Sequence, residues 1–166
     1  MRYWVGGLLV FGFALVQASS VQQFHPLGVV PNLMLVLLVS WLVVRGLDDV
    51  LPMIAVAGVT LGLIGLQTPG LVLLALVPVA LLGVVREMHI VHSDVVLVLA
   101  LVACASAAYE SVMVLGVIAM GGGRDIIAAL TRDIGPAIVV NLAITLPVYF
   151  VMRFAKPTER RHRLSY

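Results

Sequence analysis

One carboxylate stands inside a long apolar segment. Glu110, in the stretch AYESVMVLG, lies within the run from Val95 to Met120, which holds no other charged residue. A charge near the centre of a bilayer costs at least about 2.5–3.5 kcal/mol, so such a residue is protonated, hydrogen-bonded inside a bundle or open to a cavity. Three roles are open: a buried polar tie with Asn141 as its partner, a contact with another membrane protein, or a proton or substrate site. The lack of a second acid in this run favours the polar tie.

Few other residues could take part in catalysis or ligand binding. His89 and His92 stand three residues apart in REMHIVHSD, but a third well-spaced metal ligand is missing, so a solvated turn or a partner contact is the better interpretation. The glycine-rich GGGRD has neither a preceding strand nor a following lysine, which disfavours a phosphate cradle. Cys104 has no second cysteine to pair with and is interpreted as a small packing residue. We therefore predict no catalytic residue, no metal site and no cofactor.

The composition indicates a membrane as the solvent. The 166 residues are 62% hydrophobic and 11% charged, with a mean hydropathy of +1.16, against about 45–50% and about 25% in soluble domains. The pI of about 9.0 could suggest nucleic acid as a partner. Five of the ten Lys and Arg residues, however, follow residue 152, and that asymmetry sets topology instead. We expect no nucleic-acid partner.

Apolar stretches predict six transmembrane helices in one all-α domain. A span needs about 17–25 apolar residues, and the stretches that qualify or nearly qualify are 3–21, 30–45, 50–67, 70–86, 94–120 and 134–153. The first resembles a signal peptide, and we expect it to be retained as a span. The fifth would be about 39 Å long, so it must tilt or protrude. The domain would cover 1–153, followed by a basic tail, 154–166, lying on anionic headgroups.

The distribution of Lys and Arg predicts cytoplasmic N- and C-termini. Eight basic residues would lie on the inner side and only two, Arg124 and Arg132, on the outer side, where acids accompany them. The outer segment 121–133 is predicted to hold a short interfacial helix. The eight inner basic residues are Arg2, Arg45, Arg86, Arg153, Lys156, Arg160, Arg161 and Arg163.

Small residues supply a packing signal. Gly58, Gly62 and Gly65 follow the spacing i, i+4 and i+7, so they form one smooth stripe that allows close helix approach. We predict that this stripe faces lipid or a partner helix. Gln17 and Gln67 lie near the outer ends of their spans and are expected to reach water, whereas Asn141 lies deeper.

The order of these features resembles the rod-shape-determining MreD family of bacterial membrane proteins. VVPNLMLVLLVSWLVVRG carries that family's second-helix pattern at Pro31, Asn32 and Trp41. Gly58 and Gly62 look like the glycines of its third helix, and VVNLAITLPVYFVMRFAKP resembles its last helix. The chain departs from the family in helix three, because no Asp follows the glycines in LGLIG. Any role of that Asp cannot be carried over.

The resemblance implies a non-enzymatic scaffold of the cell-elongation machinery in the bacterial cytoplasmic membrane. Its direct partner would be MreC, a bitopic periplasmic protein. RodA, its penicillin-binding transpeptidase and the MreB filament would be reached indirectly, and a homodimer stays open. The partner and packing residues would be Pro31, Asn32, Gly58, Gly62, Gly65, Glu110 and Asn141.

A vitamin-binding subunit of an energy-coupling-factor transporter is the alternative, because the MreD family is similar to those six-helix subunits in fold. Such a subunit needs an outer cavity with several polar and aromatic residues. Outer-half candidates are few: Phe24, His25, Gln67, Tyr109 and Glu110. A small membrane enzyme is a third reading, and no nucleophile–base pair or metal cluster supports it.

Overall fold

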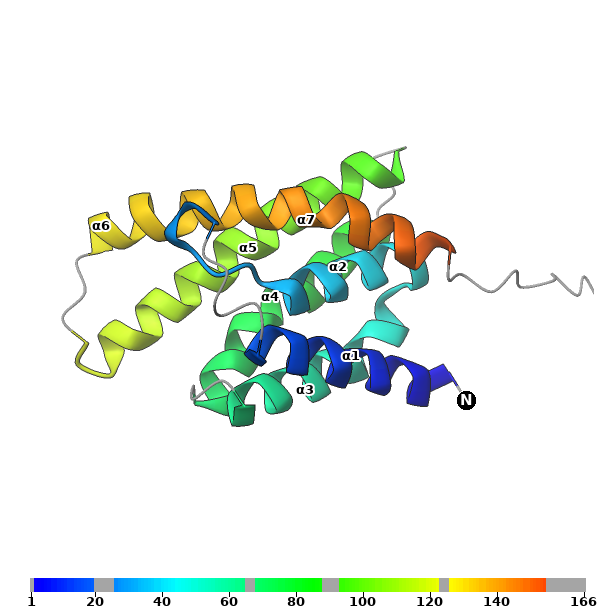
Figure 1. Cartoon of the computed structure of the whole chain (residues 1–166), viewed down its shortest axis with the longest axis horizontal. Coiled ribbons are helices and arrows are strands. Elements are labelled where there is room, and N and C mark those ends of the chain that lie inside the picture. The colour runs from blue at the N-terminus through cyan, green and yellow to red at the C-terminus, as the bar shows by residue number, and fades with distance from the viewer. Residues whose placement is uncertain (1, 20–25, 65–67, 88–92, 123–125, 155–166) are drawn as a thin grey trace, which may run out of the picture.

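The computed structural model describes residues 2–19, 26–64, 68–87, 93–122 and 126–154, and within them all regular structure is helical. The helices fold back and forth along one axis, and α1 begins at the same end of the bundle at which α7 ends (Figure 1). In chain order they are α1 (Arg2–Ser19), the 3-10 turn η2 (Pro26–Gly28), α2 (Leu33–Arg45), α3 (Leu47–Ile64), α4 (Pro69–Glu87), α5 (Asp94–Ala119), α6 (Ile126–Ala129), the π-turn η3 (Leu130–Ile134) and α7 (Gly135–Phe154).

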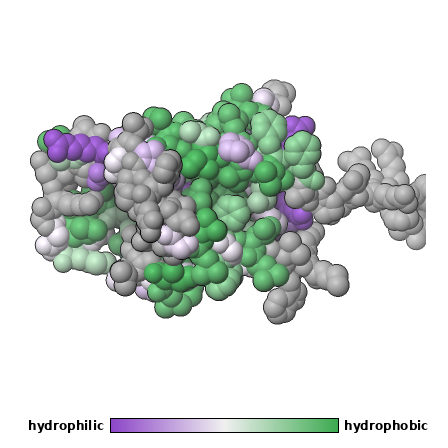
Figure 2. All heavy atoms as spheres, in the orientation of Figure 1, coloured by the Kyte–Doolittle hydropathy of each residue, from purple (hydrophilic) through white to green (hydrophobic). Residues whose placement is uncertain are grey.

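The chain is a multi-pass membrane protein by the length and apolar character of its helices. Four helical segments are long and apolar enough to cross a bilayer: α3, α4, α5 and η3 with α7. The apolar parts of α1 and α2 are shorter. Large hydrophobic side chains such as Leu8, Leu63 and Leu81 are exposed, as expected of a surface that faces lipid. In Figure 2 hydrophobic residues cover the middle of the molecule, and strongly hydrophilic residues gather near its two ends.

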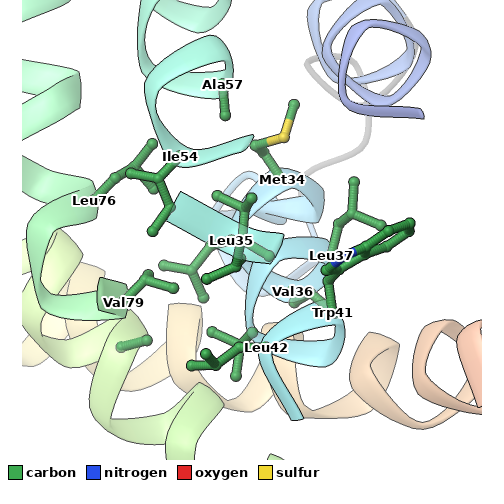
Figure 3. Close-up of a cluster of buried hydrophobic side chains, with 14 of the residues drawn as sticks. Met34, Leu35, Val36, Leu37, Trp41, Leu42, Ile54, Ala57, Leu76 and Val79 are labelled. Atoms are coloured by element: carbon green, nitrogen blue, oxygen red, sulfur yellow. The ribbon is translucent and has the colours of Figure 1, made fainter. Parts of the chain in front are cut away.

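The short helix α2 is the centre of the bundle. It contacts α1, α3, α4, α5 and α7, and every residue from Met34 to Val43 is buried. On one side Leu35 and Leu42 lie beside Leu76 and Val79 of α4, while Leu37 and Trp41 lie on another side of the same helix (Figure 3). A helix that is apolar all round is expected in such a fully enclosed position.

The C-terminal end of α2 is closed by an arginine from α4. Gly46 follows the helix with φ +104°, and its N–H donates to the Leu42 carbonyl. The Nε of Arg86 donates to the Val43 carbonyl at 3.1 Å. Carbonyls in the last helical turn lack partners within the helix, so this bond satisfies one of them and ties α4 to α2.

The glycine stripe packs inside the chain. Gly58 and Gly62 are both buried on α3, and a Cβ added at either one would overlap Leu73 or Pro69 of α4. The stripe therefore allows the α3–α4 hairpin to close and does not face lipid or a partner at these two positions, in contrast to the expectation from the sequence. Gly65 lies outside the described residues.

The hairpin formed by α5 and α7 extends beyond the other helices. The 26 residues of α5 cross the bundle obliquely, and with α6 and the start of α7 they reach past the ends of the other helices (Figure 1). This course relative to the other helices is compatible with the tilt or protrusion expected of an over-long helix. The short helix expected within 121–133 is found as α6, followed by η3. The basic tail lies outside the described residues.

Candidate functional site: a buried polar network at the start of α2

The first turn of α2 is buried among other helices. After η2 the chain returns into the bundle, and Pro31 and Asn32 are both buried where α2 begins. Backbone N–H groups at a helix start have no partner within the helix. In surroundings without water each unsatisfied group would cost several kcal/mol. The buried position of this helix start therefore demands acceptors from side chains.

Two other helices and the capping residue itself supply those acceptors. The Asn32 N–H donates to Oδ1 of Asn141 in α7 at 2.8 Å. The Met34 N–H donates to Oε1 of Gln17 in α1 at 2.9 Å. Asn32 caps the helix itself, because its Oδ1 accepts from the Leu35 N–H at 3.0 Å. Three of the four N–H groups that begin α2 thus bond to side-chain amides, which join α1, α2 and α7.

Asn141 extends the network to α5. Its Nδ2 donates to the Ser106 Oγ at 3.0 Å, and both residues are almost completely enclosed, with exposures of 1% and 0%. The Tyr109 side chain, one helical turn beyond Ser106, is hydrogen-bonded to the Asn32 side chain. The Thr145 hydroxyl donates to the Asn141 carbonyl within α7 at 2.7 Å. We call Gln17, Asn32, Ser106, Tyr109 and Asn141 the amide network.

The amide network lies deep in the bundle. Ser106 is twelve residues after the start of α5 at Asp94, and Asn141 is twelve residues before Arg153 in α7. Both separations correspond to about 18 Å of helical rise, measured from the same end of the molecule. A hydrocarbon core is about 30 Å thick, so a distance of this size from the helix ends corresponds to a position well inside a membrane-spanning bundle.

Glu110 lies beside the network. It follows Tyr109 directly in α5, is half-buried, and interacts electrostatically with that tyrosine. The side-chain hydrogen bonds of Asn141 go to Asn32 and Ser106, whereas the sequence suggested Glu110 as its partner. Glu110 itself is not without a partner.

The chemistry of the network is structural. Its members are amides and hydroxyls, which satisfy backbone groups and fix helices in register but transfer no proton at neutral pH. Among the described residues, no group of three His, Cys, Asp or Glu side chains could hold a metal ion. His89, His92, Gln67, Phe24 and His25 lie outside those residues.

Two members of the network carry roles that the sequence did not reveal. Gln17 was expected to reach water, but it is half-buried and caps α2. Ser106 looked like one more small residue in CASAA, and no local signal marks it as a partner of Asn141. The one usable signal was the pair Pro31-Asn32 before an apolar run, which is typical of a helix start. This signal indicates that Asn32 caps the helix, but it does not indicate which residues bond to Asn32.

Substituting Gln17 by Leu is expected to lower the free energy of unfolding by about 1–3 kcal/mol, because the buried Met34 N–H would lose its acceptor. Reversible unfolding in mixed detergent micelles measures this effect. The matched control is Thr60→Val, since that hydroxyl only bonds the carbonyl of Val56 in its own helix. Equal stability of the two variants would contradict the capping role of Gln17.

The network therefore defines a helix-locking centre made of residues from α1, α2, α5 and α7. Comparison with known proteins adds no family to this picture: no family model, no curated protein and no solved structure matches the chain.

Proposed function

We propose that the protein is a non-enzymatic scaffold of the bacterial cell-elongation machinery, similar to MreD, and that it binds the bitopic protein MreC. Through MreC it would act on RodA, its penicillin-binding transpeptidase and MreB. The role rests on the order of motifs in the sequence and requires a rigid membrane bundle with no reactive site. The helix-locking chemistry of the amide network fits such a bundle.

The observation that supports the proposal best is the contact between Asn32 and Asn141. These residues come from two separate motifs of the resemblance, in the second and the last helix, and are 109 positions apart in the sequence. They meet in one hydrogen bond of 2.8 Å. The two motifs on which the resemblance rests therefore meet at one point of the bundle.

We further propose six passes with both termini in the cytoplasm. In this topology α1 and the short α2, of 13 residues, complete the set of four longer spans. The excess of basic residues on one side supports this orientation. The start of α1 and the end of α7 lie at the same end of the bundle, which agrees with two termini on one side of the membrane (Figure 1).

Co-purification tests the partner. The tagged protein, expressed in a rod-shaped bacterium and extracted in a mild detergent, is expected to retain a single-span protein with a periplasmic coiled coil. Substituting two outward-facing residues, such as Leu63 and Leu81, one at a time by Trp maps which face the partner uses. Tight binding of a vitamin, with a matching rise in thermal stability, would instead favour the transporter subunit.

Two substitutions of Glu110 separate a polar tie from a proton site. Glu110→Gln keeps the size and hydrogen-bonding capacity but removes the titrating group, so complex formation and rod shape are expected to persist. Glu110→Leu removes the polar contact of this half-buried residue and is expected to weaken both. Complementation of a strain depleted of the native protein, scored by cell shape, is the measurement. Loss of rod shape with the Gln variant would restore the proton-site hypothesis.

A further inference from the structure

The exposed side of α7 carries a proline close to the middle of its apolar span. The helix buries Asn141 and Thr145 among its neighbours, whereas Ala143 and Pro147 lie on the exposed side. Ala143 is the central residue of the span Arg132–Phe154, eleven residues from each end. By helical rise it is about 16 Å from either end, a depth at which lipid surrounds the exposed side of a spanning helix.

Pro147 deprives one backbone acceptor on this exposed side of its usual donor. In an α-helix the carbonyl of residue i accepts from the N–H of residue i+4, and proline has no N–H, so the Ala143 carbonyl lacks that bond. The Thr145 hydroxyl, which is close along the helix, donates to the Asn141 carbonyl instead. Backbone groups freed by proline in a membrane helix are satisfied by neighbouring helices, since leaving them unpaired in lipid costs several kcal/mol. On an exposed side, that neighbour must come from outside the bundle.

The carbonyls freed by the other two helix prolines lie closer to the membrane surfaces. Pro52 frees the carbonyl of Asp48, in the first turn of α3. Pro78 frees the carbonyl of Leu74, five residues after the start of α4, which is about 7 Å by helical rise. Headgroups and water can reach these two positions. The carbonyl of Ala143 is therefore the one that requires a donor inside the hydrocarbon.

A second copy of the chain does not supply this donor by symmetric packing. In a twofold pair the exposed side of α7 would meet itself. No side chain on that side between residues 139 and 151 is a hydrogen-bond donor: the exposed residues are Val139, Ala143, Leu146, Pro147, Phe150 and Val151. On the described parts of α3 and α5, the hydroxyls of Thr60 and Ser111 already donate to carbonyls of their own helices.

We propose that the exposed side of α7 around Ala143 and Pro147 binds a transmembrane helix of another protein, which presents a hydroxyl or amide side chain to the Ala143 carbonyl. The small Ala143 side chain allows that helix to approach closely. Val139 and Phe150, with exposures of 56% and 43%, flank the contact on either side along α7. This inference assigns a face and its recognition chemistry, and it does not depend on the identity of the partner proposed above.

Photocrosslinking in cells of the source organism tests the face. Benzoylphenylalanine is placed at Val139 or Phe150 on α7 and, as matched controls, at Leu74 or Leu81 on α4, all of which are exposed. Both α7 positions are expected to capture the same transmembrane segment, and its sequence, read by mass spectrometry, to contain Ser, Thr, Asn or Gln at the depth of Ala143. Capture of a second copy, of a segment without such a residue, of no protein, or of the same segment equally from α4 would overturn the proposal.

A double-mutant cycle tests the hydrogen bond itself. Pro147→Ala restores an N–H to the helix at an exposed position, so thermal stability is expected to persist or rise. Replacing the captured donor residue by Ala is expected to weaken association about three- to tenfold beside Pro147 and less than twofold beside the Pro147→Ala variant. The control Pro78→Ala is expected to leave the full effect. Equal losses in all backgrounds would overturn the proposal, whereas a captured partner without a periplasmic coiled coil would contradict only the proposed scaffold function.

Discussion

Substituting Asn141 by Leu is expected to destabilise the protein by about 3 kcal/mol or more, the largest effect among single polar substitutions in the bundle. The side chain accepts from the Asn32 N–H and donates to Ser106, so its removal leaves a backbone donor at a helix start and a hydroxyl oxygen without those bonds. Both groups are buried. The free energy of unfolding in mixed micelles and the yield of monodisperse protein after extraction measure the effect.

Two further substitutions in the bundle are compared with Asn141→Leu. Thr145→Val removes a hydroxyl that bonds only the Asn141 carbonyl, one turn earlier in the same helix, so it is expected to change stability by less than about 1 kcal/mol. Ser106→Ala removes one bond of the network and is expected to lie between the two, at about 1 kcal/mol. An Asn141→Leu variant as stable as the Thr145→Val variant would contradict the role of Asn141 in holding the start of α2.

Substituting Gly62 by Ala is expected to separate the α3–α4 hairpin and cost about 1–3 kcal/mol. The new Cβ would overlap Pro69, including its backbone Cα, and a backbone atom cannot move unless the start of α4 moves with it. Proline also restricts the local backbone, which makes that movement harder. Thermal unfolding in detergent, followed by the loss of helical circular dichroism, measures the change.

Alanine substitutions at Gly58 and Gly12 are compared with Gly62→Ala in the same measurement. At Gly58 the closest atoms belong to the flexible Leu73 side chain, which can adopt another rotamer, so Gly58→Ala is expected to cost less than Gly62→Ala. At Gly12 nothing lies within 4 Å, and Gly12→Ala is expected to be neutral or slightly stabilising, as alanine favours helices over glycine. The reverse order of the three variants would contradict the packing described for α3 and α4.

The position of the glycine stripe also changes how a partner must be sought. Leucine at Gly58 or Gly62 would disturb the hairpin itself, so a loss of partner binding in such variants would report misfolding. The surface available to a partner is made of exposed side chains instead, such as Phe11 on α1, Leu74 on α4 and Phe150 on α7. Substitutions there leave the core intact and give a cleaner test of association.

Much of the fold followed from hydropathy. The predicted spans coincide with α1 to α5 and α7 to within three residues at each described end, because helices that cross a bilayer must be both long and apolar. The short helix after α5 followed from the pattern of residues 121–133. The start of α2 at Leu33 is three residues later than the predicted span 30–45, and Pro31-Asn32 before an apolar run is the local signal for that start.

The partners of the buried polar groups could not be predicted in the same way. Asn32 and Asn141 were each visible as polar residues, but their contact joins positions 109 residues apart. Gln17 lies near the end of its helix, where water was the simpler partner. Its side-chain oxygen instead accepts from the Met34 N–H, because the chain turns back into the bundle after η2 and α2 begins inside it. Such a return is a property of packing, which no local spacing indicates.

The amino-acid sequence alone determined that the solvent is a bilayer, where the apolar helices run and which residues are too polar or too small to be ordinary lipid-facing side chains. Only the tertiary structure decided which face of each helix is inside. The physical reason is that lipid is as apolar as the protein core, so a membrane helix needs no amphipathic pattern to distinguish the two. Glu110 and Asn141 could thus be recognised as buried polar residues, but their suggested pairing was wrong, because the Asn141 side chain bonds Asn32 and Ser106. Gly58 and Gly62 could be recognised as a close-packing surface but not assigned to α4.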